Sequence, residues 1–185
     1  MISLVSTSCQ KDKEQSTIQP VNSLFSLTSI AVTNGLLLDA YKCEPKVNGI
    51  ENSIPLSWSN APSNATSFAI TMVHYPDPKD STHLNSYLLL WGIDKSITQI
   101  PYAQADKGPW FMGSNKDGNT ISYTSPCSPS SGSHRYIITI YALSATPPGL
   151  PTESSLSVNY TVLINALATV SIIVKATLVF NSVTP

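Results

Sequence analysis

Two stretches of the chain alternate apolar and polar residues with the period of a β-strand. Side chains of a strand point to opposite faces in turn, so every second residue shares a face. In the first stretch, over residues 67–73, one face carries Phe68, Ile70 and Met72, with His74 next on that face. In the second, over residues 137–143 with its opening at 132–136, one face carries His134, Tyr136, Ile138, Ile140 and Ala142. Both patterns predict strands that present a histidine at one end of an apolar face.

Other stretches predict further strands and one helix. Residues 87–93 are apolar throughout, as in a strand buried on both faces, and residues 25–32 alternate loosely. Residues 158–168 have helical spacing without Gly or Pro. For residues 172–180 a continued helix and a last strand both stay open, and we favour a short helix followed by β-structure from about Thr177. With fourteen prolines and little helix, the chain is predicted to be β-rich.

Composition narrows the classes of partner. The 185 residues are enough for one domain with a sizeable core. Ten basic and eleven acidic residues give a net charge of −1, and Arg135 is the single arginine. A chain without a basic stripe is not expected to bind nucleic acid. No apolar span reaches the length that crosses a bilayer, so contact with a membrane is expected only through a lipid anchor.

The N-terminus resembles the end of a bacterial lipoprotein signal. Residues 1–8 are small and apolar, Cys9 follows them, and a polar stretch comes next. We therefore predict lipid attachment at Cys9, a flexible tether up to residue 22, and a domain over residues 23–185. This predicts export and anchoring in the bacterial cell envelope. The alternative is a disordered tail with an incidental cysteine.

Residues 123–141 carry a more specific motif. Tyr123 precedes a Ser-Pro-Cys-Ser-Pro loop that contains Pro126, Cys127 and Pro129, and a Gly-x-His-Arg-Tyr strand opening follows. This order resembles the bacterial branch of the phosphatidylethanolamine-binding protein family, over roughly residues 25 to 180. The resemblance implies an all-β fold, a two-sheet antiparallel β-sandwich with one or two C-terminal helices. It also implies a small anion pocket at one end of the sandwich.

Matching the family's pocket motifs to this chain gives a set of candidate ligand-binding residues. They are His74, Asp77, Tyr87, Tyr123, Pro126, Cys127, Pro129, His134 and Tyr136. Without gaps His74 takes the place of a family aspartate, whereas a shift of one residue brings Asp77 onto the second aspartate, and both alignments stay open. Tyr87 aligns with a family histidine. Imidazoles and phenols donate hydrogen bonds to phosphate oxygens, and protonated imidazoles add positive charge.

These residues predict a non-enzymatic protein that binds a small anion, either phosphate or a phospholipid head group. The resemblance implies no cofactor, and the histidines and carboxylates show no short-spaced metal pair. An alternative is a regulator of another protein, such as a protease or kinase inhibitor. A hydrolase with Cys127 as nucleophile and His134 as base is a distant third possibility.

The resemblance also leads to expectations about geometry. If the strands that carry His74 and His134 are neighbours, both imidazoles converge in one pocket with at least one of Tyr87, Tyr123 and Tyr136. The loop 126–129 then forms a wall, and Tyr87 or Trp91 forms the floor. Affinity is expected to rise as the pH falls through the histidine range, and His134→Ala is expected to weaken binding most. Cys43 and Cys127 are either a disulfide or two free thiols, and both remain open.

Overall fold

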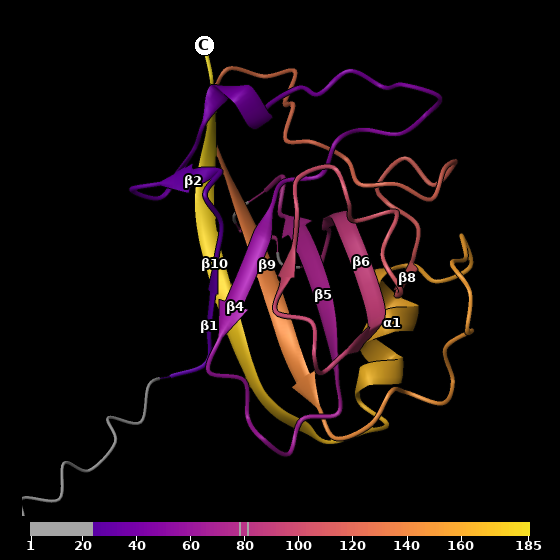
Figure 1. The fold of residues 1–185 in the computed structure, drawn as a ribbon. Coiled ribbons are helices and arrows are strands. Elements are labelled where there is room, and N and C mark those ends of the chain that lie inside the picture. The colour runs from indigo at the N-terminus through magenta and orange to yellow at the C-terminus, as the bar shows by residue number, and fades with distance from the viewer. Residues whose placement is uncertain (1–23, 78, 81) are drawn as a thin grey trace, which may run out of the picture.

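The computed structural model describes residues 24–77, 79–80 and 82–185, and it folds as two packed β-sheets with one short α-helix (Figure 1). The predicted lipid attachment at Cys9 and the tether up to residue 22 lie outside the described residues. No helix in the described part of the chain is long and apolar enough to cross a membrane. The all-β class and the two-sheet architecture that we expected are confirmed.

The smaller sheet has the strand order β1–β4–β7, with β1 (Ser26–Thr28), β4 (Leu56–Ser59) and β7 (Gln99–Ile100). The larger sheet has the order β2–β3–β10–β9–β5–β6–β8. Its strands are β2 (Val32–Thr33), β3 (Leu36–Leu37), β10 (Ile172–Thr184), β9 (Gly132–Leu143), β5 (Ser67–His74), β6 (Asn85–Asp94) and β8 (Phe111–Met112). The pairs are antiparallel except for β3 with β10. A 3-10 turn, η1, spans Asp39–Tyr41.

Two cores lie on the two faces of the larger sheet. The main core fills the space between the sheets and includes Trp58, Phe68 and Tyr136. The second core lies between the larger sheet and helix α1 (Tyr160–Leu167), where Trp91 packs with Leu163. This explains why residues 87–93 are apolar throughout: each face of β6 is covered by a different core.

Helix α1 forms where the spacing predicted it. The side chain of Asn159 caps its first turn by accepting a hydrogen bond from the Val162 N–H at 3.0 Å. Leu163 and Leu167, one turn apart, are buried against the sheet. In Figure 1 the helix lies behind the larger sheet, on the side of β6 and β8.

Two of the predicted elements differ from the structure. The last strand begins at Ile172 rather than near Thr177, because β9 offers a partner along almost the whole of β10, and the β-branched residues 172–174 suit a strand. Residues 25–32 form two short strands rather than one, because a turn at 29–31 separates them.

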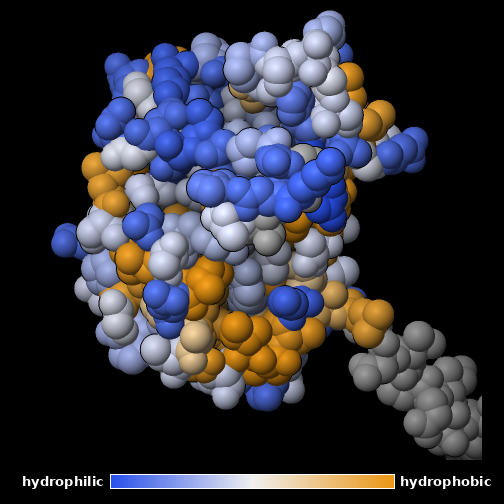
Figure 2. All heavy atoms as spheres, turned by 180° about the vertical axis from the view of Figure 1, so that it is seen from behind, coloured by the Kyte–Doolittle hydropathy of each residue, from blue (hydrophilic) through white to orange (hydrophobic). Residues whose placement is uncertain are grey.

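The two ends of the sandwich differ in polarity. Seen from behind, the surface is mostly hydrophilic in the upper half and carries its apolar patches in the lower half (Figure 2). The upper half is the end at which β5 stops and β9 begins (Figure 1). Polar side chains therefore gather at the end where His74 and His134 lie.

Candidate functional site

The register of the central strands brings His74 and His134 together. His74, the last residue of β5, lies directly opposite Tyr136 of β9, and His134 is two residues earlier on the same face of β9. The ring centroids of the two histidines are 5.8 Å apart. The His74 ring also stacks on Tyr136 at 4.9 Å. The predicted convergence of the two imidazoles is therefore confirmed.

A hollow of about 280 Å³ opens between these side chains. Eleven residues line it: His74, Pro76, Asn85, Tyr87, Lys116, Cys127, Ser128, Pro129, Ser130, His134 and Tyr136. None of them is an aspartate or a glutamate, so the lining itself contributes no negative charge. We call this hollow the anion pocket, after the ligand class that the family resemblance led us to expect.

Backbone carbonyls orient both imidazoles. His74 donates from Nδ1 to the Arg135 carbonyl, and His134 donates from Nε2 to the Ser130 carbonyl, each at 2.9 Å. A carbonyl oxygen only accepts hydrogen bonds, so these nitrogens carry the protons. Among the described residues, none forms a hydrogen bond with the second nitrogen of either ring, Nε2 of His74 or Nδ1 of His134. When a ring gains a proton, this nitrogen becomes a cationic donor.

A β-bulge places Tyr87 in the pocket. Met72 pairs with Leu88 and Val73 pairs with Ser86, which leaves Tyr87 as an extra residue on β6. Its ring meets Tyr136 edge to face at 5.0 Å. Burial raises the pKa of Tyr87 and of Tyr136, so both phenols keep their protons and are donors at neutral pH.

Lys116 is the one lysine that lines the pocket. Its Nζ lies 6.0 Å from the centroid of the Tyr87 ring and 2.7 Å from Asp117 Oδ1. Asp117 is also 2.7 Å from Lys46, so two lysines share one carboxylate. Lys116 was not among the predicted site residues. The only signal for it was its place in the turn at residues 113–118, since a surface lysine has no sequence pattern that reveals its position.

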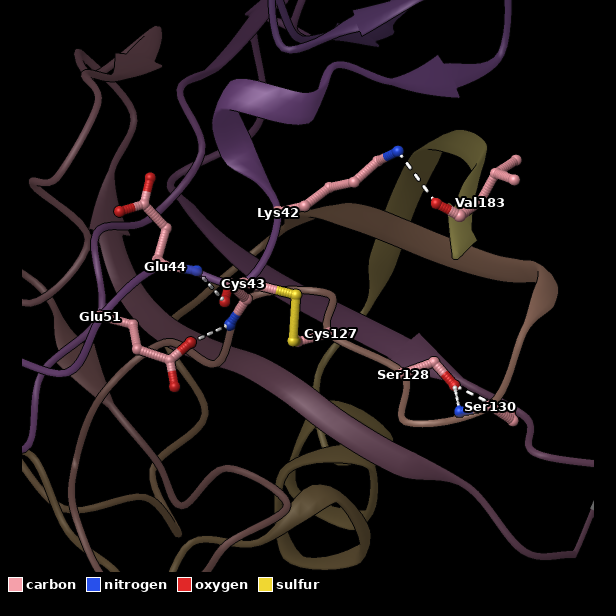
Figure 3. Close-up of a disulfide and its surroundings, with 9 residues drawn as sticks. Lys42, Cys43, Glu44, Glu51, Cys127, Ser128, Ser130 and Val183 are labelled. Carbon is pink, nitrogen blue, oxygen red and sulfur yellow. Dashed lines mark hydrogen bonds between the residues drawn. A yellow bond between two sulfur atoms is a disulfide. The ribbon is translucent and has the colours of Figure 1, made fainter. Parts of the chain in front are cut away.

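The loop wall of the pocket, residues 127–130, is fastened by a disulfide. Cys127 is bonded to Cys43 with a Cα separation of 4.7 Å, which decides between the two alternatives left open above (Figure 3). The Cys43 N–H also donates to the Pro126 carbonyl at 3.2 Å. Since Cys127 is in a disulfide, it carries no thiolate, and the hydrolase built on Cys127 and His134 lacks its nucleophile.

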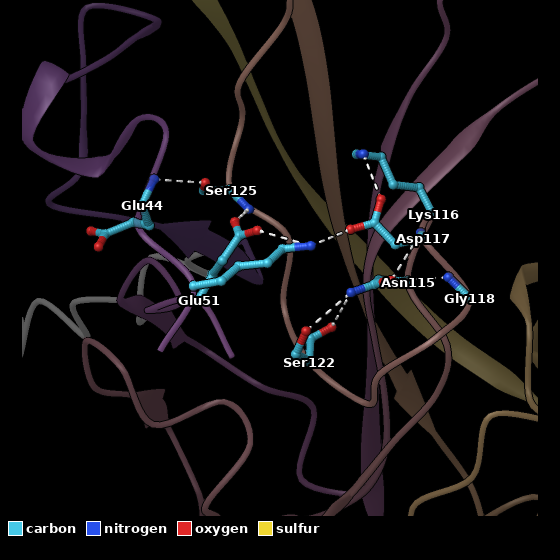
Figure 4. A network of polar contacts seen from close by, with 9 residues as sticks. Glu44, Glu51, Asn115, Lys116, Asp117, Gly118, Ser122 and Ser125 are labelled. Carbon is cyan, nitrogen blue, oxygen red and sulfur yellow. Dashed lines mark hydrogen bonds and ion pairs between the residues drawn. The ribbon is translucent and has the colours of Figure 1, made fainter. Parts of the chain in front are cut away.

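A buried carboxylate supports the same loop from behind. Glu51 is only 6% exposed and accepts a hydrogen bond from the Ser125 N–H (Figure 4). The Ser125 hydroxyl in turn accepts from the Glu44 N–H at 2.9 Å. Glu51 also faces Lys46 at 3.8 Å, which links it through Asp117 to Lys116. The network ties the loop to residues 43–51 and to the turn that carries the pocket lysine.

Three expectations about the site need correction. Asp77 does not line the pocket; its carboxylate accepts the Lys79 N–H and holds an exposed turn. Tyr123 is fully buried outside the pocket, and Pro126 supports the loop only through its carbonyl. Of the two alternatives for the floor, Tyr87 lines the pocket, whereas Trp91 packs under α1 on the opposite face of β6.

The remaining candidates, His74, Tyr87, Cys127, Pro129, His134 and Tyr136, all line the pocket. Besides Lys116, residue patterns had not marked Pro76, Asn85, Ser128 and Ser130 as lining residues. Within the described residues, no cluster of three histidine, cysteine, aspartate or glutamate side chains is arranged to hold a metal ion.

A β-sandwich with a small, largely preformed polar hollow at one end is a domain suited to binding small molecules. A family model described as phosphatidylethanolamine-binding protein matches residues 28–176. The chain belongs to the phosphatidylethanolamine-binding protein family. Its membership supports a binding protein of that family's kind.

Individual relatives agree with this assignment. A UPF0098 protein from Methanothermobacter thermautotrophicus is 31% identical over 112 residues, which cover 59% of this chain and 69% of that protein. The solved structure of the homologue CT736 from Chlamydia trachomatis has a TM-score of 0.70 at 24% identity, covering 87% of this chain and 98% of that one. The structure of YbcL from E. coli has a TM-score of 0.69 at 20% identity, with coverage of 87% and 99%. At these identities the two structures establish the fold.

Proposed function

We propose that the protein is a non-enzymatic binding protein that holds a phosphate-type anion in the anion pocket. The observation that carries this proposal is the convergence of hydrogen-bond donors from four separate elements. Strand β9 and strand β5 supply His134 and His74, the bulge of β6 supplies Tyr87, and the 113–118 turn supplies Lys116.

The electrostatics support an anion rather than a cation. Lys116 is a cationic residue, both phenols donate, and among the described residues no carboxylate lines the cavity. A charge-assisted hydrogen bond is about twice as strong as a neutral one, so an anionic ligand gains more from these donors than a neutral ligand does. The volume of about 280 Å³ is enough for a phosphate or a phosphate-bearing head group.

The same proposal holds that the protein does not catalyse a reaction and that it is exported to the cell envelope. Cys127 is in a disulfide, and disulfides persist in oxidising compartments outside the cytoplasm. This supports export, and with it the lipid attachment predicted at Cys9. The protein would then present its pocket in the cell envelope.

The test is calorimetric titration with inorganic phosphate. Replacing His134 with alanine removes one donor to the anion, so the dissociation constant is expected to rise about ten- to hundredfold. The control is Arg135→Ala, which removes a neighbouring cation on the opposite face of β9 and is expected to leave the constant within about threefold. If neither phosphate nor phosphate esters bind the wild type, the assignment of this hollow as an anion-binding site is wrong. A regulator of another protein then becomes the leading alternative.

A further inference from the structure

A second, larger hollow opens beside the anion pocket. Its volume is about 560 Å³, against about 280 Å³ for the anion pocket. It is lined by Pro76, Thr82, His83, Leu84, Asn85, Ser86, Asn159, Tyr160 and Thr161. Pro76 and Asn85 line both hollows. A ligand held in the anion pocket therefore has this second hollow within reach of any group attached to it.

Asn85 stands at the junction of the two hollows. It is the first residue of β6 and pairs with His74, so its place is fixed by the same sheet that positions the imidazoles. No described residue forms a hydrogen bond with its side chain. An amide both donates and accepts, so Asn85 suits a polar group of a ligand that spans the two hollows.

The lining of the second hollow is polar but does not favour another anion. The described residues that line it include neither lysine nor arginine, and their polar groups are mainly hydroxyls and amides. The one histidine among these described residues, His83, is already hydrogen-bonded to Asp80 through its Nδ1. Hydrogen bonds from Thr82 and His83 lower the pKa of Asp80 to about 2, so this carboxylate stays negative beside the hollow and repels anions.

The donors and acceptors here match alcohol groups. Burial raises the pKa of Tyr160 to about 12, so its phenol keeps its proton at neutral pH. Thr161 follows it in the first turn of α1, and Ser86 lies opposite on β6. The hydroxyls of Tyr160 and Thr161 can each donate one hydrogen bond and accept others, which is the pattern that a hydroxyl-rich ligand offers in return. The Ser86 hydroxyl already donates to the Ser114 carbonyl at 3.5 Å, so it is left to accept from the ligand.

We propose that the ligand is a phosphate ester of a polyhydroxylated alcohol, with its phosphate among His74, His134 and Lys116 and its hydroxyls in the second hollow. This inference rests on the proposed function of the anion pocket. Two or three hydrogen bonds in the second hollow would make such an ester bind about tenfold more tightly than a phosphate without hydroxyls. The same chemistry occurs in a soluble sugar phosphate and in a phosphorylated lipid head group.

The experiment measures the binding of three soluble probes by titration calorimetry and the binding of one kind of vesicle by flotation. The probes are inorganic phosphate, methyl phosphate and glucose 6-phosphate, and the vesicles contain phosphatidylglycerol diluted in phosphatidylcholine. The double variant Tyr160→Phe with Thr161→Val removes two oxygen atoms from the hollow and little else. Thr177→Val, an exposed threonine of β10 away from both hollows, is the matched control.

We expect glucose 6-phosphate to bind about tenfold more tightly than methyl phosphate, and the double variant to abolish most of this difference without changing methyl phosphate binding. Flotation of the wild type with phosphatidylglycerol vesicles, lost in the double variant, would also support the inference. The bound phosphate ester would then be a lipid head group. Equal affinity for methyl phosphate and glucose 6-phosphate, with no vesicle binding, would overturn the inference and leave the anion pocket intact. If none of the probes binds, both proposals fall.

Discussion

His74 and Tyr136 reach the anion pocket from paired strands, whereas residues 127–130 reach it from a loop that belongs to no sheet. The strand wall, made of His74, Tyr87, His134 and Tyr136, is held by the ladder of the larger sheet and by ring stacking. Behind Tyr136 the stack continues to Phe180 of β10 at 5.5 Å. Removing any one contact would leave this wall supported by the rest of the sheet.

The loop wall depends on a few specific bonds instead. One disulfide, the hydrogen bond from Cys43 to Pro126 and the carboxylate of Glu51 connect residues 125–127 to the segment that precedes them by about eighty residues. The loop in turn supplies the Ser130 carbonyl that orients His134. His134 lies on a strand of the central sheet, but the orientation of its ring still depends on the disulfide-bonded loop wall.

The strongest way to break this comparison is to remove the disulfide. Replacing Cys43 and Cys127 together with serine removes a crosslink between residues 84 apart, and we expect the free energy of unfolding to fall by about 4 kcal/mol on the chain-entropy model. Urea denaturation measures this loss.

Hydrogen exchange in the same double variant compares the two walls directly. Amides of residues 124–130 are expected to exchange faster under native conditions, while those at the centre of β9 keep their protection relative to the new global stability. Equal acceleration in both walls would show that the disulfide stabilises the whole domain without a special effect on the loop. Reduction of the wild type with dithiothreitol serves as the control for the serine substitutions themselves.

A smaller effect is expected from Glu51. Glu51→Ala leaves the buried Ser125 N–H without its acceptor, which costs about 2 kcal/mol of folding stability. Glu51→Gln is the matched control, because an amide oxygen still accepts this hydrogen bond, and its loss should be clearly smaller. Both are measured by urea denaturation. An equal loss in the two variants would assign the role of Glu51 to its charge beside Lys46 rather than to support of the loop.

The smallest effect is expected at Asp77, which sharpens the boundary of the pocket. Its carboxylate accepts the Lys79 N–H at 2.8 Å and its carbonyl accepts the Asp80 N–H at 3.1 Å, so Asp77 serves the turn. Asp77→Ala is expected to leave the dissociation constant for inorganic phosphate within about twofold while lowering stability by up to about 1 kcal/mol. Titration calorimetry with inorganic phosphate measures the affinity, and urea denaturation measures the stability. Asp77→Asn is the control, because its amide oxygen can still accept the Lys79 N–H. A tenfold change in phosphate affinity would show that Asp77 contributes to ligand binding after all.

Local patterns were sufficient to put His74 and His134 on the apolar faces of their own strands. The alternation at Phe68, Ile70 and Met72 gave β5 its inward face, and the matching alternation after Tyr136 did the same for β9. Because a strand has a period of two, a histidine next on such a face lies at the end of the core. The pairing of the two strands was only a condition of that prediction and is shown by the structure, whereas the helical spacing before residue 168 predicted α1.

Only the tertiary structure could place Lys116 and the last strand, and only it shows how Tyr87 reaches the pocket. Tyr87 enters the pocket because a bulge adds one residue to β6, and a bulge depends on the pairing with β5 rather than on the sequence of β6. Residues 172–176 join β10 because β9 presents a long unpaired edge to them. Lys116 meets the pocket through a turn fixed by Asn115 and Ser122. Each of these positions depends on contacts between segments distant in the sequence, which no local period encodes.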